Sequence, residues 1–273
     1  MSSAPFDYLR HLITVPVVVN GSIETRFVLD SGIGLTVVSE SLADASGCAL
    51  SGSSYVGKRM SGQEVTIPLG TVGSLATASM LRENLEVGVL DMSTFPPEFD
   101  TMGGFIALGF FQERPFTLDY PRRAVVLESD ETLPTRIEEG TLVDLDVKRD
   151  EHSVTAFLPI TIPSGRSIKV EVDMGSDELI LDASIAVELG VDLDDPSVRR
   201  VEGEDETGHR FTRYFTQLEG GIHATDAPDL LQPNPDVMFQ KIIYEGLLGH
   251  SFLRNFIVTY DLHRSRLILA RPA

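Results

Sequence analysis

Residues 27–32 read Phe-Val-Leu-Asp-Ser-Gly, and residues 170–175 read Val-Glu-Val-Asp-Met-Gly. The two aspartates, Asp30 and Asp173, are 143 positions apart. The same offset relates, without a gap, Pro16 to Pro159 and Gly47 to Gly190. A repeat this long in a chain of 273 residues indicates one supersecondary unit used twice. If the two units pack about a pseudo-twofold axis, the two carboxylates meet at that axis, where a pair of carboxylates can activate water.

Both aspartates are predicted to stand just past the end of a β-strand. Asn20-Gly21 separates two apolar runs in the first half, and Ser164-Gly165 does so in the second. An Asn-Gly pair between apolar segments is a strong hairpin signal, and alternation of apolar and polar residues indicates a half-buried strand. Gly32 and Gly175 then permit a tight turn after each strand.

A short strand and a helix are predicted after each of these turns. Ser39 and Asp182 are the expected N-caps of the two helices, while Gly47 and Gly190 stand where a C-terminal glycine is expected.

A second correspondence joins the ends of the two halves. It aligns Gly109 with Gly249 at an offset of 140, and Asp119 with Asp261 at an offset of 142. Residues 128–150 are rich in acidic residues and form the best candidate for a linker, although their apolar residues could add a strand. We therefore expect an N-terminal lobe over residues 1–135 and a C-terminal lobe over residues 136–273.

Composition excludes several functional classes. A hydrophobic fraction of 42% argues for a folded chain, and a net charge of −19 argues against nucleic acid and against anionic membrane surfaces. No apolar run is long enough to span a membrane, and the N-terminus does not resemble a secretion signal. With a single cysteine, Cys48, the chain cannot form an internal disulfide, so we expect a cytoplasmic location.

Other catalytic patterns are incomplete. Residues 52–59 nearly match a phosphate-binding loop, but Arg59 stands where a hydroxyl must contact magnesium. The six histidines lack the spacing of zinc ligands, and no Gly-x-Ser-x-Gly elbow supports a serine hydrolase.

The Asp-Ser-Gly motif at residues 30–32, followed in each half by an apolar-Gly element at Gly109 and Gly249, resembles the aspartic protease superfamily of pepsins and retropepsins. Residues 246–253 look especially similar to bacterial retropepsin-like domains. The resemblance implies an all-β, bilobal, pepsin-like fold with two pseudo-twofold related β-barrel lobes and short helices. It also implies a cleft between the lobes, covered by hairpin flaps. The candidate flap tips are Ser61 and Gly62 in the first lobe, and Thr207 and Gly208 in the second.

The resemblance further implies an aspartic endopeptidase in which Asp30 and Asp173 are catalytic and share one proton. The residues expected to support this pair are Ser31, Gly32, Gly175 and Ser176. The expected substrate is an extended peptide or protein. No metal or organic cofactor is needed, and a monomer suffices because one chain supplies both aspartates.

Two departures from the family pattern leave an alternative open. Met174 stands where a hydroxyl would lock the second aspartate loop, and Ile33 stands where a hydroxyl would support the first carboxylate. These residues favour a weak or inactive, protease-derived module that binds a peptide without cutting it. A processing enzyme that acts on a single partner protein is a third possibility.

Overall fold

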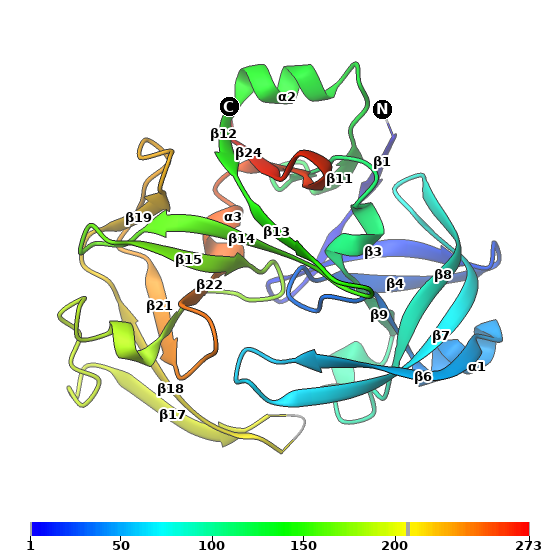
Figure 1. The fold of residues 1–273 in the computed structure, drawn as a ribbon, viewed down its shortest axis with the longest axis horizontal. Helices are drawn as coiled ribbons and strands as arrows, with labels where there is room; N and C mark the ends of the chain where they lie inside the picture. Colours follow the sequence, from blue (N-terminus) through cyan, green and yellow to red (C-terminus); the bar gives the residue numbers. More distant parts are fainter. Residues whose placement is uncertain (1, 206–207, 273) are drawn as a thin grey trace.

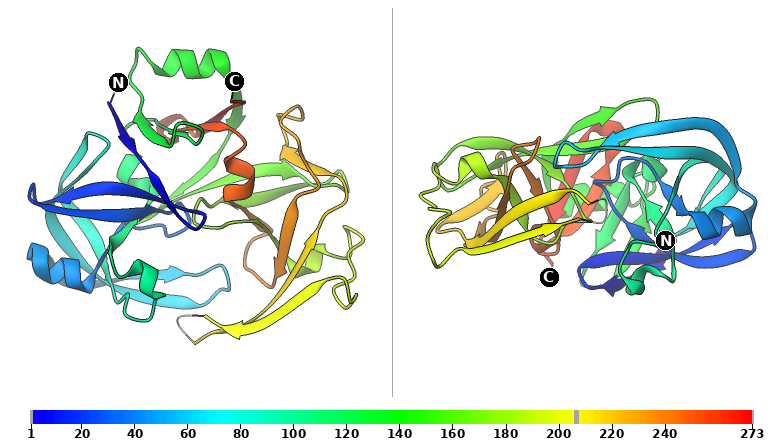
Figure 2. Two further views of the ribbon diagram at one scale, coloured as in Figure 1. Left: turned by 180° about the vertical axis from the view of Figure 1, so that it is seen from behind. Right: turned by 90° about the horizontal axis from the view of Figure 1, so that it is seen from below.

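The computed structural model describes residues 2–205 and 208–272, and most of them lie in β-strands. Two lobes stand side by side, and a third sheet spans them at the end of the molecule where both chain termini lie (Figure 1, Figure 2). The fold is therefore bilobal and all-β, as the sequence predicted.

The first lobe is one sheet with the strand order β2-β3-β4-β9-β5-β8-β7-β6. Helix α1 (Glu40–Ser46) packs beside it, and Ser39 accepts a hydrogen bond from Leu42 N as the predicted cap. The strands are β2 (Asp7–Leu9), β3 (Leu12–Val19), β4 (Ile23–Leu29), β5 (Val37–Ser39), β6 (Ala49–Lys58), β7 (Glu64–Thr77), β8 (Met80–Leu90) and β9 (Met102–Ile106). The near-match to a phosphate-binding loop falls mainly on β6, an extended strand at the edge of this sheet.

The second lobe has the strand order β17-β18-β21-β16-β22-β15-β14-β19-β20, with β13 added beside β14. Its strands are β13 (Asp146–Arg149), β14 (Val154–Thr161), β15 (Ser167–Val172), β16 (Leu179–Asp182), β17 (Arg199–Glu204), β18 (Arg210–Gln217), β19 (Gly221–Ala224), β20 (Gln232–Pro233), β21 (Asp236–Gln240) and β22 (Gly246–Leu248). The predicted helix after Asp182 forms only a 3-10 turn, η3 (Ala183–Ile185), although Asp182 does accept from Ser184 N.

The third sheet has the order β1-β11-β10-β23-β24-β12 and contains strands from both ends of the chain. These are β1 (Ser2–Pro5), β10 (Phe116–Asp119), β11 (Ala124–Leu127), β12 (Thr141–Asp144), β23 (Ile257–Asp261) and β24 (Arg266–Ala270). The equivalent strands β10 and β23 pair at its centre, where Thr117 Oγ1 lies 2.7 Å from Thr259 Oγ1. The proposed linker holds α2 (Leu133–Glu139) as well as β12 and β13.

Strand register corrects the second sequence correspondence. β4 pairs in parallel with β9 so that Leu29 lies opposite Ile106, and β15 pairs in parallel with β22 so that Val172 lies opposite Leu248. Ile106 is therefore equivalent to Leu248, an offset of 142 rather than 140. The alignment of Gly109 with Gly249 was wrong because it matched the glycines alone, whereas backbone pairing to the aspartate strands fixes equivalence.

Short helical turns and loops complete the lobes. The turns are η1 (Pro97–Phe99), η2 (Leu108–Phe111), α3 (His250–Leu253) and η4 (Leu262–Arg264). The long loop before β9 packs its rings Phe95 and Phe99 against Phe105, so it covers an edge of the first lobe's core. No helix among the described residues has the length and apolar character needed to cross a membrane.

Candidate active site

The backbone follows the same path at the two aspartates, from the end of a strand into a turn. Asp30 N donates to Ile106 O at 3.0 Å, and Asp173 N donates to Leu248 O at 3.0 Å. After each aspartate the chain turns back, so that Gly32 N donates to Asp30 Oδ1 at 2.8 Å and Gly175 N donates to Asp173 Oδ1 at 2.9 Å. The Asp-x-Gly sequence thus builds the same carboxylate-holding turn twice.

Folding brings these two turns face to face. A Cβ atom built on Gly32 would lie 2.8 Å from Asp173 Cγ, and one built on Gly175 would lie 2.6 Å from Asp30 Cγ. The carboxyl groups of Asp30 and Asp173 are close enough for each to act on the other. Each glycine therefore makes room for the opposite carboxylate, which explains why the motif needs glycine at this position.

Electrostatics favour a single shared proton in this pair. Burial raises the pKa of Asp30 well above its usual value, and the charge of Asp173 raises this pKa further. Two apposed carboxylates cannot both ionise without strong repulsion, so the pair titrates as one unit. One acid and one base are thus available together near neutral pH.

A single hydroxyl locks the two turns together. Ser31 Oγ donates to Val172 O at 2.7 Å and accepts from Met174 N at 2.8 Å, which ties the first turn to the second. The Met174 side chain is buried and has no hydroxyl that could donate an equivalent hydrogen bond to the first turn. Ser176 Oγ donates to Asp173 Oδ2 at 2.5 Å, whereas the Ile33 side chain packs with neighbouring apolar residues. Each turn therefore has one hydroxyl that hydrogen-bonds at the site, Ser31 in the first and Ser176 in the second.

Removing the Ser31 hydroxyl tests this lock. Ser31→Ala would leave the Val172 carbonyl and the Met174 N–H buried without partners, so we expect a loss of about 1–3 kcal/mol in the free energy of unfolding. Urea denaturation measures it. Ser31→Thr keeps the hydroxyl and serves as the matched control. Equal stability of the alanine and threonine variants would show that the lock contributes nothing.

The first hairpin of each lobe forms a hydrogen bond to the aspartate turn of the opposite lobe. The His11 ring, in the turn between β2 and β3, bonds through Nε2 to Gly175 O at 3.1 Å. From the second lobe, Val154 N donates to Gly34 O at 3.2 Å. These contacts hold the two aspartate turns in one relative position.

Two long hairpins reach across between the lobes, one formed by β6 and β7 and the other by β17 and β18 (Figure 1). At the first tip, Met60 O accepts from Ile243 N of the second lobe at 2.9 Å. Arg59 forms an ion pair with Asp205 of the second hairpin, with 3.6 Å between Nε and Oδ2. This places the predicted flap residues Ser61 and Gly62 at a tip that contacts the opposite lobe.

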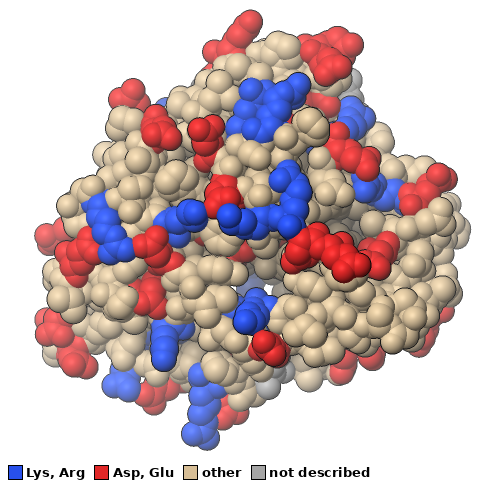
Figure 3. Space-filling view, in the orientation of Figure 1, with Lys and Arg blue, Asp and Glu red and all other residues tan. Residues whose placement is uncertain are grey.

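The second predicted flap tip is only partly described. Gly208 lies in the turn between β17 and β18 with φ +77°, while Thr207 lies outside the described residues. The first hairpin also carries a tyrosine. Tyr55, on β6, lies edge-on to His152 with 6.0 Å between ring centroids. Figure 3 shows that this face of the molecule is hollowed between the two lobes.

Glu171 is a third acid at the site that sequence reasoning missed. It is only 3% exposed, and burial followed by the charges of Asp173 and Asp30 raises its pKa to about 9. The signal was present in the sequence, since Glu171 stands two residues before Asp173, where the first half has Val28. A charged residue in a strand whose counterpart is apolar deserves a functional explanation.

The raised pKa of Glu171 makes stability depend on pH. The folded protein retains a proton up to about pH 9 that the unfolded chain releases near its ordinary pKa of 4.5. The free energy of unfolding therefore falls as pH rises between these values, by up to about 1.4 kcal/mol per pH unit for one proton. We expect Glu171→Gln to reduce this slope between pH 5 and 8, while Asp30 maintains part of it.

Urea denaturation at several pH values measures this slope. Glu138→Gln, at an exposed position on α2, is the matched control and should behave as the unmodified protein. Identical slopes with and without Glu171 would contradict the assignment of a raised pKa to this residue.

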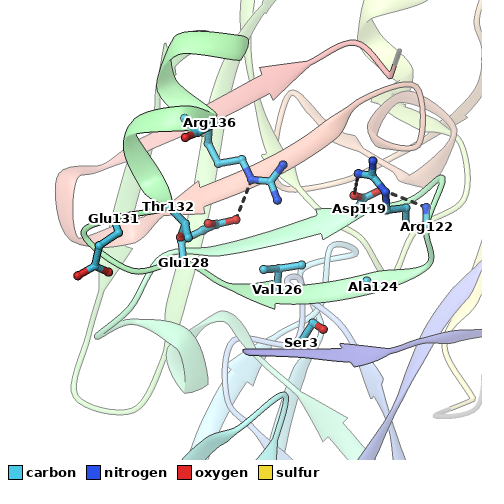
Figure 4. Close-up of a pocket in the computed structure, with 10 residues that line it drawn as sticks. Ser3, Asp119, Arg122, Ala124, Val126, Glu128, Glu131, Thr132 and Arg136 are labelled. Atoms are coloured by element: carbon cyan, nitrogen blue, oxygen red, sulfur yellow. Dashed lines mark hydrogen bonds and ion pairs between the residues drawn. The ribbon is translucent and has the colours of Figure 1, made fainter. Parts of the chain in front are cut away.

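A separate hollow of about 600 Å³ lies between α2 and the six-stranded sheet (Figure 4). Two ion pairs line it, Arg136 with Glu128 and Arg122 with Asp119, each 2.8 Å long. None of the predicted site residues lines this hollow.

A family model and a solved structure are similar to this chain. Residues 15–106 match the family model described as aspartyl protease, a stretch that contains Asp30 but not Asp173. The resemblance to the aspartic protease superfamily is confirmed. Among solved structures, the crystal structure of basic 7S globulin from soybean matches with a TM-score of 0.55 and 12% identity, over 100% of this chain and 95% of that one. At this identity the likeness shows the pepsin-like fold alone. No curated protein matched the chain.

Proposed function

We propose that this aspartic-protease-like protein is an endopeptidase in which Asp30 and Asp173 activate one water molecule. The observation that carries the proposal is the face-to-face packing of the two aspartate turns, in which each glycine contacts the opposite carboxylate. The shared proton supplies the second requirement of the chemistry, an acid beside a base.

The reaction divides between the two carboxyl groups. The ionised carboxylate takes a proton from the bound water, whose oxygen attacks the carbonyl carbon of the peptide bond. The protonated carboxyl group donates a hydrogen bond to the carbonyl oxygen as negative charge develops there. The proton taken from water then passes to the leaving nitrogen, the C–N bond breaks, and the pair again holds one proton. Asp30 and Asp173 carry out every proton transfer in this reaction.

The substrate is an extended peptide lying between the aspartates and the two hairpins. The contact between Met60 and Ile243 closes the first hairpin over the second lobe, so this hairpin must lift to admit a peptide. Because one chain contributes both aspartates, we propose a monomer as the active unit.

Digestion of an unbiased peptide library tests the function. We expect cleavage within about pH 3 to 8, inhibition by pepstatin, and no cleavage by Asp30→Asn. The absence of cleavage throughout that range, for both the library and a lysate of native proteins, would refute the proposal.

A binding module is the second candidate, favoured by Met174. Its buried side chain leaves the turns locked by one hydroxyl rather than two, and looser geometry lowers the rate of a positioned reaction. Such a module would bind library peptides at every pH tested and release them intact. Calorimetric titration with the peptides that the protein retains separates this outcome from catalysis.

A further inference from the structure

Glu171 lies on the face of β15 that points away from the main hydrophobic core. On β15 its neighbours Val170 and Val172 belong to the main hydrophobic core, and successive side chains of a strand point to opposite faces. Glu171 therefore shares the face of Asp173, whose charge acts on it. In the sheet it lies opposite Phe157 on one side and Leu247 on the other.

The carboxyl group of Glu171 has no partner in the described residues. It makes no hydrogen bond or ion pair there, and the charges that act on it, those of Asp173 and Asp30, are both negative. A buried carboxyl group without a partner is costly to maintain. A cation brought in by a ligand would relieve that cost, whereas an anion would increase it.

The surroundings of Glu171 suit the stem of a long basic side chain. Ile180, Met238, Ile242 and Leu247 form a separate apolar cluster in the second lobe, and Met60 of the first hairpin packs against it. Tyr244 also packs against this cluster and lies edge-on to Phe157, with 5.3 Å between ring centroids. Lysine and arginine place their methylene stems along apolar surface and extend the charge beyond it.

The first lobe differs at the equivalent position. Val28 stands in place of Glu171 and forms a buried apolar cluster with Val37 and Phe105. Partly buried apolar residues pack against this cluster, and they include Ile33 beside the first aspartate turn. The two lobes therefore present different chemistry on either side of the aspartates.

We propose that Glu171 selects a lysine or arginine side chain next to the cleaved bond, while the partly buried apolar residues packed against the Val28 cluster contact an apolar side chain on the other side. Successive side chains of an extended peptide point in opposite directions, so the residues flanking one peptide bond can reach the two lobes. The inference rests on the proposed function for the position of the peptide, but selection of a basic residue requires only binding. The net charge of −19 favours the approach of such peptides.

Binding of a basic side chain is coupled to release of a proton. The cation favours the carboxylate form of Glu171, so affinity should rise with pH until the group is already ionised in the free protein. The titratable groups that face Glu171 are Asp173, Asp30 and Tyr244. In each comparison below the proteins are studied at one pH and share Asp173 and the same residue at position 30, so differences report on Glu171.

The kinetic test uses two peptides that differ only by lysine or norleucine at one position flanking the cleaved bond. We expect kcat/KM to favour lysine by about tenfold or more in the unmodified protein, as one charged hydrogen bond provides. Glu171→Gln should remove this preference. Glu171→Val, which copies the first lobe, should reverse it in favour of norleucine, and Glu138→Gln on α2 should keep it.

A binding test separates this inference from the proposed function. Calorimetry with the same peptides and the Asp30→Asn protein, with and without Glu171→Gln, measures selectivity without cleavage. One outcome is that the lysine peptide binds selectively only where Glu171 is present, while neither the unmodified protein nor a variant cleaves it. That outcome supports the role of Glu171 and refutes the proposed peptidase activity. Cleavage with equal or greater preference for norleucine in the unmodified protein overturns the role of Glu171 and leaves the peptidase standing.

Discussion

Replacing Asp30 or Asp173 with asparagine is expected to lower kcat by about 100-fold to 10,000-fold, the range in which a positioned acid or base contributes. Asparagine keeps the shape of the side chain but cannot accept or deliver the proton. The two single variants and the double variant should lose similar amounts, because the two carboxyl groups act as one unit on one water molecule. Steady-state cleavage of a peptide found in the library provides the measurement.

Stability distinguishes this loss of activity from unfolding. Burial and the charge of Asp173 raise the pKa of Asp30, so the ionised form of Asp30 is disfavoured in the folded protein. Asp30→Asn removes that ionisation and should leave the free energy of unfolding at neutral pH unchanged or higher. Retained activity in either single variant would remove that aspartate from the mechanism.

Gly175→Ala is expected to lower kcat by about 100-fold, the effect of displacing a reacting group by about 1 Å. The added methyl group would lie 2.6 Å from Asp30 Cγ, closer than real Cβ contacts, so the Asp30 carboxyl group must move. Gly32→Ala should act in the same way on Asp173, where the corresponding distance is 2.8 Å. Neither glycine has a positive φ, so the effect arises from the contact rather than from backbone strain.

Gly165→Ala is the matched control, in the hairpin turn before Asp173. Its φ is +85° and nothing lies within 4 Å of an added Cβ. Alanine there should lower the free energy of unfolding by about 1 kcal/mol and leave kcat intact. Full activity of Gly175→Ala would show that the two turns are not closely apposed in the working protein.

Much of the local structure follows from local sequence. The repeated hairpins, the aspartate turns and the Ser39 cap depend on neighbouring residues, so pattern and turn chemistry predicted them. The second helix did not form beyond a 3-10 turn, because helix length in proteins depends on packing more than on caps. The equivalence of Ile106 with Leu248 was missed because it is defined by pairing between distant strands.

The candidate site, like the fold, was determined in part by the sequence and in part by the tertiary structure. The sequence alone determined the two aspartate turns, since the duplicated unit supplies one aspartate, one glycine and one supporting hydroxyl to each half. Only the tertiary structure decided that Gly175 contacts Asp30 and that Ser31 reaches across to Met174. It also decided that Glu171 has no hydrogen-bond or ion-pair partner within residues 2–205 and 208–272. The physical reason is that hairpins and turns form from bonds between near neighbours. Apposition, burial and the resulting pKa shifts depend on how the two lobes pack together, because the aspartates that meet there are 143 positions apart in the chain.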